Sequence, residues 1–170
     1  MLITGVSPGG LGAEAARVIA LHRPALIILA GRSVAKGKQT EQSLHEQSPH
    51  INTRLLSLDL GNLQSVKDAA AEVNLYGETI DILINNAGIM ALPSLTRTWD
   101  DFEMHFAVNF LGHFLFTNLI MPKILGAGPG ARIVNVSSNG YTYSSVHFED
   151  PNYQVRQQFT RVDILFLGRC

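Results

Sequence analysis

Residues 4–12, TGVSPGGLG, lie between a short apolar run at residues 1–3 and a helical pattern at about residues 13–21. Glycine permits positive φ and leaves room for a ligand against the backbone. The free N–H groups at the start of the following helix attract an anion such as a pyrophosphate. Glycine-rich turns are often ordinary turns, but a strand before this one and a helix after it predict a dinucleotide-binding turn.

Apolar runs and helical patterns alternate along the rest of the chain. The runs are short and each is closed by turn residues, as expected of strands buried on both faces of a parallel sheet. The expected strands are residues 26–30, 54–58, 80–84 and 131–136, and the expected helices are residues 33–47, 63–75 and 99–125. With the first strand and helix, they predict an α/β fold, a Rossmann-type doubly wound parallel sheet of about five strands. The dinucleotide-binding domain would cover residues 1–153, and the divergent tail at residues 154–170 is not assignable.

Composition excludes several classes of protein. The 170 residues are enough for roughly one domain, and a formal net charge of −1 offers no electrostatic footprint for nucleic acid. The one cysteine is Cys170 and the six histidines are scattered, so neither a disulfide framework nor a metal site is expected. The apolar run at residues 106–121 is too short and too polar for a membrane span. We therefore expect a soluble cytoplasmic protein with no metal, no nucleic-acid partner and no membrane span.

The residues after the second expected strand bear on the choice of dinucleotide. A carboxylate about 20 residues after the last glycine would accept a hydrogen bond from the ribose 2′-hydroxyl of NAD. Arg32 stands at that position instead, with Lys36 close behind. Cations favour a 2′-phosphate, so the sequence predicts NADP as the cofactor. The alternative is a solvated basic start to the next helix.

Asp59 follows the third expected strand, at the edge where ligands bind in open α/β sheets. Its carboxylate could accept a hydrogen bond from the amino group of an adenine. It could equally cap the helix that begins near Asn62. Position alone leaves both hypotheses open.

Five motifs in a fixed order indicate a family resemblance. They are the glycine turn, Leu58-Asp59-Leu60, Asn85-Asn86-Ala87-Gly88, VNFLGHF at residues 108–114 and RIVNVSS at residues 132–138. Each motif is weak alone, but in this order they resemble the short-chain dehydrogenase/reductase family over about residues 1–153. The similarity is greatest to its retinol-dehydrogenase-like branch, which often has fungal members. The resemblance implies an oxidoreductase that transfers a hydride between NADP(H) and a small-molecule carbonyl or alcohol substrate.

The resemblance also implies roles for individual residues. The implied cofactor contacts are Gly5, Gly10, Leu11 and Gly12 at the pyrophosphate, Arg32 and Lys36 at the 2′-phosphate, Asp59 at the adenine, and Asn86, Ala87 and Gly88 along the nicotinamide ribose. Asn109 would hold a water in the proton relay, and Ser138 would donate to the substrate carbonyl and stabilise charge on its oxygen. The alternatives are a helix residue packed beside a loop for Asn109 and a polar strand end for Ser138. Relatives commonly associate through the long helix, here residues 99–125, which implies a homo-oligomer.

The chain departs from the family pattern in the glycine turn and in the proton donor. The turn is one residue longer than T-G-x-x-x-G-x-G, so Gly9 and Gly10 compete for the middle role. The family's proton donor is a tyrosine followed four residues later by a lysine, whose charge lowers the pKa of the phenol. None of the tyrosines after Lys123 has that lysine. The pairs at that spacing are Tyr141 with Ser145, Tyr143 with His147, and Tyr153 with Gln157.

The sequence also stops before the sixth and seventh strands of the family, so we expect the C-terminal part of the fold to be missing. Tyr153 is the one substitute acid that we nominate. General acid catalysis contributes about 10²–10⁴-fold to a rate, so a chain without the tyrosine–lysine pair would be a slow enzyme. Three hypotheses stay open: an active NADP-dependent reductase, a non-catalytic NADP-binding or partner-binding module, and an inactive gene-model fragment.

Overall fold

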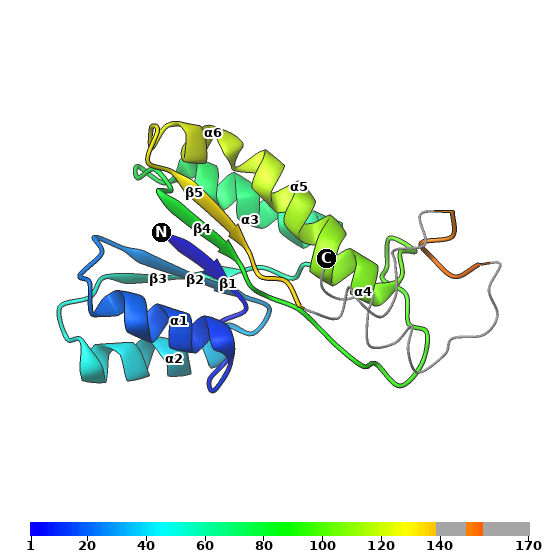
Figure 1. Ribbon diagram of the computed structural model, residues 1–170, viewed down its shortest axis with the longest axis horizontal. Helices are drawn as coiled ribbons and strands as arrows, with labels where there is room; N and C mark the ends of the chain where they lie inside the picture. The colour runs from blue at the N-terminus through cyan, green and yellow to red at the C-terminus, as the bar shows by residue number, and fades with distance from the viewer. Residues whose placement is uncertain (139–148, 155–170) are drawn as a thin grey trace.

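The structure is a computed structural model, and it describes residues 1–138 and 149–154. A parallel sheet of five strands lies between two layers of helices (Figure 1). The strands are β1 (Leu2–Thr4), β2 (Ile27–Gly31), β3 (Thr53–Ser57), β4 (Ile82–Asn85) and β5 (Arg132–Asn135). They lie in the order β3-β2-β1-β4-β5. The α/β, doubly wound fold that the sequence predicts is confirmed.

The helices are divided between the two sides of the sheet (Figure 1). One side carries α1 (Leu11–Ala20) and α2 (Val34–Gln47). The other side carries α3 (Leu63–Leu75), α4 (Met104–Phe106), η1 (Ala107–Leu111), α5 (Gly112–Leu119) and α6 (Met121–Leu125). The segment η1 is a stretch of π-helix between α4 and α5.

Alternation along the central strand explains the two-sided core. Leu2 packs into the cluster on the α3 and α5 side, with Val66 and Phe116. Ile3 points to the opposite face and packs into the cluster that contains Ala16 of α1. Successive side chains of a strand face opposite sides of the sheet. Burial of each large aliphatic side chain stabilises the fold by about 1.5–3 kcal/mol, so both helical layers are held to the same strand.

The strand order reverses at β1. In the sheet, β1 pairs with β2 on one side and with β4 on the other. The crevice outside the carboxyl ends of the strands at such a point is where open α/β sheets bind ligands. The glycine turn follows β1 and Asn86 follows β4, so both segments lie at this crevice.

The helix expected at residues 99–125 begins later than the sequence predicts. Thr98 N–H donates to Phe102 O at 2.9 Å, which closes a turn, and Asp101 in that turn has a φ of +60°. Aspartate tolerates the left-handed conformation and favours turns. The prediction is therefore wrong for residues 99–103, where turn chemistry outweighs the apolar periodicity.

A side-chain cap and a proline determine where the helical segments between residues 104 and 125 begin and end. The Glu103 side chain accepts from Phe106 N–H at 2.7 Å and caps α4. Ile120 ends α5, and Pro122 lies in the first turn of α6, where its missing N–H costs no helical hydrogen bond. One expected helix is therefore four consecutive segments. The other expected helices and strands agree with the structure to within two residues at each end.

Two observations concern membrane spans and metal sites in the described part of the chain. No helix in that part is long and apolar enough to cross a membrane. Within residues 1–138 and 149–154, no three His, Cys, Asp or Glu side chains form a group that could hold a metal ion. Tyr141, Tyr143 and the tail beyond Gln154 lie outside the described residues.

Candidate functional site

A cleft opens at the carboxyl ends of the strands around the point where their order reverses. It contains a cavity of about 360 Å³, lined by the glycine turn, the residues after β2, β3 and β4, and Val108 of η1. All of the cofactor-binding residues that the sequence predicts line this cavity, except Gly12. The fold therefore brings segments that are far apart in the sequence into one cleft.

Gly5 and Gly12 allow two walls of the cleft to approach closely. Gly5 has a φ of +75°, and a Cβ there would lie 2.5 Å from Ala87 Cα. A Cβ on Gly12 would lie 2.5 Å from both Gly5 O and Asn86 Nδ2. A side chain at either position would push the loop after β4 away from the glycine turn. Gly12 does not line the cleft, but its lack of a side chain lets Gly5 and Asn86 pack closely together.

Gly9 and Gly10 occupy different positions in the turn. Gly9 has a φ of +75° and open space where its Cβ would be. Gly10 is the N-cap of α1 and lines the cleft, and its N–H donates to Ser7 O at 3.0 Å. The turn thus leads directly into α1, whose first N–H groups carry partial positive charge. Of the two glycines, Gly10 has the position in the cleft.

Arg32 and Lys36 lie where the cleft meets the end of β2. Both line the cavity. Ser33, between them, caps α2, and its hydroxyl accepts from Lys36 N–H at 3.3 Å. Two cationic side chains at one end of the cleft favour an anionic group there.

Asp59 lines the cleft at the end of β3. Its Oδ1 accepts from Gly61 N–H at 3.0 Å. The cap of α3 is Asn62, whose Oδ1 accepts from Gln64 N–H at 3.0 Å and from Ser65 N–H at 3.1 Å. The hypothesis that Asp59 caps this helix is therefore wrong, because Asn62 satisfies the first-turn donors.

Thr4 joins the glycine turn to the loop after β4. Its Oγ1 accepts from Asn86 N–H at 3.0 Å and from Ala87 N–H at 2.9 Å. In return, Asn86 Nδ2 donates to Thr4 O at 2.8 Å and to Gly5 O at 3.1 Å. These four hydrogen bonds hold two walls of the cleft in a fixed relation.

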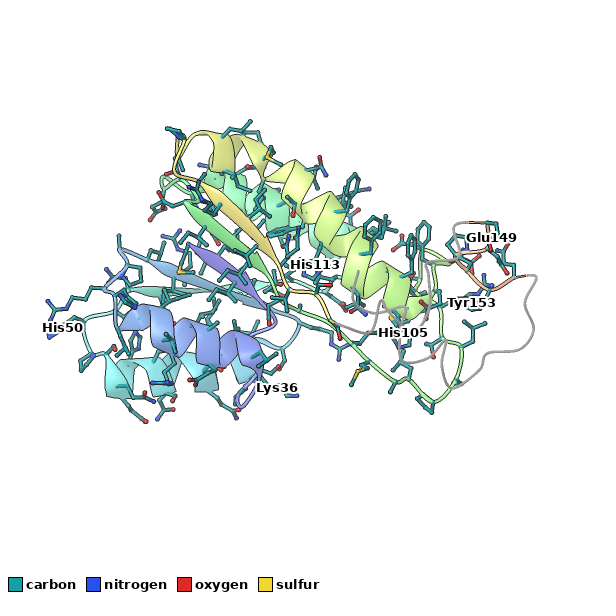
Figure 2. All side chains as sticks on the ribbon, in the orientation of Figure 1. Lys36, His50, His105, His113, Glu149 and Tyr153 are labelled. Atoms are coloured by element: carbon teal, nitrogen blue, oxygen red, sulfur yellow. The ribbon has the colours of Figure 1, made fainter. Side chains whose placement is uncertain are left out.

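His113 completes this network from α5 (Figure 2), and sequence reasoning missed it. Its Nε2 lies 2.9 Å from Thr4 Oγ1. Burial lowers the pKa of His113 to about 4, and a hydrogen bond to the Asn109 backbone opposes that shift. The imidazole is therefore neutral at pH 7, with one ring nitrogen as a donor and the other as an acceptor. The available signal was its spacing of four residues from Asn109, which places both on one helix face.

Asn109 holds the loop after Gly88 through its side chain. Its Oδ1 accepts from Ile89 N–H at 2.8 Å, and its Nδ2 donates to Ile89 O at 2.9 Å. Gly88 is next to this contact, and a Cβ there would lie 3.2 Å from Asn109 Oδ1. Asn109 lies in η1, and single π-helical turns are frequent at functional sites. The side chain thus packs against a loop, and its role toward a water stays a prediction.

Ser138 and Tyr153 come from segments that follow β5. Ser138 lies at the same edge of the sheet as Asn86, because β4 and β5 are parallel. Tyr153 is buried, near the start of α4 (Figure 2), where Asn152 Oδ1 accepts from Glu103 N–H at 2.9 Å. Tyr153 is not part of the cleft lining. The structure does not bring it together with the cofactor-binding residues, and its role as an acid stays a prediction.

A second cavity, of about 420 Å³, lies between α5 and the strands β4 and β5. Phe110 and Phe114 contribute to its lining. Asn85, also in the lining, donates through Nδ2 to Thr117 Oγ1 at 3.1 Å and to Asn135 Oδ1 at 2.9 Å. Its Oδ1 is buried without a hydrogen-bond partner among the described residues. Among the described residues, the second cavity therefore has a buried hydrogen-bond acceptor without a partner.

Comparison with known proteins places this architecture in a family. Residues 1–150 match the family model for short chain dehydrogenase. The oxidoreductase fscI of Fusarium equiseti is 35% identical over 155 residues, which is 89% of this chain and 60% of that protein. Human retinol dehydrogenase 13 is 39% identical over 163 residues, which is 95% of this chain and 47% of that protein. The chain spans about half the length of the curated relatives it matches.

A solved structure shows the same arrangement of strands and helices. A metagenomic short-chain oxidoreductase in complex with NADP is 26% identical, and it superposes with a TM-score of 0.66 over 81% of this chain and 61% of that chain. The family model covers most of this chain. The chain therefore belongs to the short-chain dehydrogenase family, and within it is similar to the retinol dehydrogenases and to fungal oxidoreductases.

Proposed function

We propose that this chain binds NADP(H) and takes part in hydride transfer between NADP(H) and a small-molecule carbonyl or alcohol. One observation carries the proposal. The glycine turn and the loop after β4 cross at Gly5, where a side chain has no room beside Ala87. Close backbone packing where the strand order reverses, beside a helix N-terminus, suits a pyrophosphate.

Each wall of the cleft would meet a different part of the dinucleotide. The glycine turn would present backbone N–H groups to the pyrophosphate, and the residues after β2 would meet the 2′-phosphate. The proposed contacts are Gly5, Gly10 and Leu11 at the pyrophosphate, Arg32 and Lys36 at the 2′-phosphate, Asp59 at the adenine, and Asn86, Ala87 and Gly88 at the nicotinamide ribose. Gly12 would act behind them, by allowing the close packing of Gly5 and Asn86.

The proposed preference for NADP rests on charge at the end of β2. Arg32 and Lys36 line the cleft there, and residues 31–38 contain no aspartate or glutamate. A ribose 2′-hydroxyl would find no carboxylate to accept its proton, whereas a 2′-phosphate would find a guanidinium that can donate two parallel hydrogen bonds. The positions therefore favour NADP over NAD.

The catalytic part of the proposal concerns the groups that would meet the substrate. When bound, the nicotinamide supplies or accepts the hydride. Ser138 would donate a hydrogen bond to the substrate oxygen, and Asn109 would hold the adjoining loop through Ile89 and keep a water in place. Tyr153 is the nominated acid. The sequence contains no tyrosine followed by lysine four residues later, so we expect turnover to be lower by about 10²–10⁴-fold than with that pair.

A non-catalytic NADP-binding or partner-binding module is the second candidate. The same absence of the tyrosine–lysine pair from the sequence favours it. The cleft supports both candidates equally, because the hydrogen bonds of Thr4 and Asn86 hold its walls without any catalytic group.

Two measurements on the 170-residue chain separate these candidates. NADPH titration, followed by nicotinamide fluorescence and by the shift in Tm, tests binding, and we expect saturable binding that stabilises the fold. NADPH oxidation with a panel of ketones and aldehydes tests turnover. Turnover that is lost in Ser138→Ala and in Tyr153→Phe supports the reductase, and binding without turnover supports the module. No saturable binding would contradict both.

A further inference from the structure

A third cavity, of about 400 Å³, lies beside the cofactor cleft and shares two residues with it. Arg32 and Asp59 line both cavities. Thr98 and Trp99 contribute to the lining of the third cavity, but not to that of the cleft. The third cavity therefore begins where the adenine end of the proposed cofactor would lie.

Trp99 extends into solvent from a backbone that is fixed on both sides. The residue is 96% exposed, and the sequence contains no other tryptophan. The preceding Thr98 is buried, and its N–H donates to Phe102 O at 2.9 Å. The following Asp100 accepts from Leu63 N–H at 3.0 Å, which ties the turn to the start of α3.

A large aromatic side chain in this setting is better suited to binding than to folding. An indole that is this exposed contributes little to the core of the described residues, and tryptophan is enriched at interfaces. Every nucleic-acid base has a π-face that stacks on an aromatic ring. Because hydrogen bonds already hold the backbone of the turn, little backbone entropy would be lost when a base covers the indole.

We propose that Trp99 forms the outer wall of an adenine subsite and stacks on the purine of NADP(H). The inference rests on the proposed function, because it takes the adenine to lie next to Asp59. Asp59 would accept a hydrogen bond from the adenine amino group, and Arg32 would hold the 2′-phosphate. The indole would then cover a face of the ring that points toward the third cavity. The ligand class is a 2′-phosphorylated adenine nucleotide, with or without its nicotinamide half.

Intrinsic fluorescence tests this directly, because Trp99 is the sole tryptophan. Adenosine 2′,5′-bisphosphate is the probe, since it carries the adenine and the 2′-phosphate but no nicotinamide. We expect it to quench the Trp99 emission saturably. Nicotinamide mononucleotide is the matched ligand, and we expect it to leave the emission unchanged.

Two substitutions at the same position test stacking in the complete cofactor. We expect Trp99→Ala to weaken NADPH binding by about 5- to 30-fold, measured by nicotinamide fluorescence. Trp99→Phe retains a ring, so its Kd should stay within about threefold of the original. The control is Leu75→Ala, which removes an exposed apolar side chain at the end of α3, outside the linings of the cleft and the third cavity, and should leave NADPH binding unchanged. The Tm of each unliganded variant should be unaltered, because Trp99 is not part of the core.

The outcomes distinguish this inference from the function on which it rests. If NADPH binds but adenosine 2′,5′-bisphosphate leaves the Trp99 emission unchanged, the stacking proposal is overturned and the proposed function stands. Equal Kd values for the original chain and Trp99→Ala have the same meaning, as does equal quenching by both half-ligands. If the original chain does not bind NADPH at all, the proposed function fails and the inference falls with it.

Discussion

In β1 every residue is buried, whereas in β5 all four residues are exposed. The β1 region lies inside the sheet, with helical layers on both sides (Figure 1), and the cleft opens at its end. The β5 region borders the second cavity, where the Asn85 Oδ1 has no partner among the described residues. We call β1, the glycine turn at residues 4–12 and the loop after β4 the enclosed region, and most of the proposed cofactor contacts lie in it or at its rim.

This difference indicates how binding and catalysis would divide in the molecule. The cleft walls are held by hydrogen bonds from Thr4, Asn86 and His113, all of which lie within the first 113 residues. The proposed catalytic groups Ser138 and Tyr153 follow the exposed strand β5. We therefore expect the chain to bind its cofactor better than it turns over a substrate.

Gly12→Val should have the largest effect, because it separates the walls of the enclosed region. The new side chain would meet Gly5 O and Asn86 Nδ2, both 2.5 Å from the ideal Cβ position. We expect the free energy of unfolding to fall by about 3 kcal/mol and NADPH binding to weaken by more than about 100-fold. Urea unfolding and NADPH fluorescence measure the two losses.

A substitution with room for its side chain is the control for Gly12→Val. A Cβ on Gly77 would meet no atom within 4 Å, so Gly77→Ala should change neither measurement appreciably. Normal NADPH binding by Gly12→Val would show that the walls can separate without loss, and the enclosed region would not be the binding region.

Low pH should reduce the free energy of unfolding, because His113 takes up a proton more readily in the unfolded chain than in the folded one. Burial lowers the pKa of His113 to about 4 in the folded chain, and an unfolded histidine has a pKa of about 6.5. As pH falls, the unfolded chain takes up this proton first. The contribution to stability is therefore complete above about pH 6.5 and is lost as pH falls toward 4, with a total of about 3 kcal/mol.

Replacement of the titrating group tests this. The free energy of urea unfolding should fall less steeply between about pH 6.5 and 4 in His113→Gln than in the original chain. The side-chain amide of Gln can donate to or accept from the Thr4 hydroxyl. His45→Gln, which removes an exposed imidazole from α2, is the matched control. An unchanged slope in His113→Gln would mean that burial does not lower the pKa of His113 in the folded chain.

Much of the cleft follows from the sequence because its residues are set at the ends of strands. The glycine turn, Asp59 and Asn86 each come after an apolar run, and a parallel sheet brings such ends to one edge. Crossover rules then reduce the possible orders of the strands to a few, and the structure selects β3-β2-β1-β4-β5. The fold and the positions of the proposed cofactor contacts were therefore predictable.

Contacts between distant segments were not predictable in the same way. Thr4 and His113 are 109 residues apart, and their hydrogen bond depends on how α5 packs against the sheet. The start of α4 was misplaced because the turn at Asp101 depends on local backbone chemistry that apolar periodicity does not report. Choosing Asn62 over Asp59 as the cap of α3 likewise needed the hydrogen-bond geometry.

Arg32→Ala should have an intermediate effect, because it changes charge at the rim of the enclosed region. If the guanidinium meets the 2′-phosphate, NADPH binding should weaken by about 10- to 100-fold, while NADH binding should change little. Lys67→Ala makes the same charge change on the exposed surface of α3 and is the matched control. Equal weakening of NADPH and NADH would place Arg32 away from the 2′-phosphate and leave the preference for NADP without support.

The smallest effects come from removing the same carbon from each of the two regions. Ile3 is fully buried and Ile133 is 38% exposed. We expect Ile3→Val to lower the free energy of unfolding by about 1 kcal/mol, because it leaves a gap in a packed core. Ile133→Val should lower it by less than about 0.3 kcal/mol, because solvent already reaches that side chain. Parallel urea titrations measure both. Equal losses would show that β5 is covered in solution, and the contrast between the two regions would then be wrong.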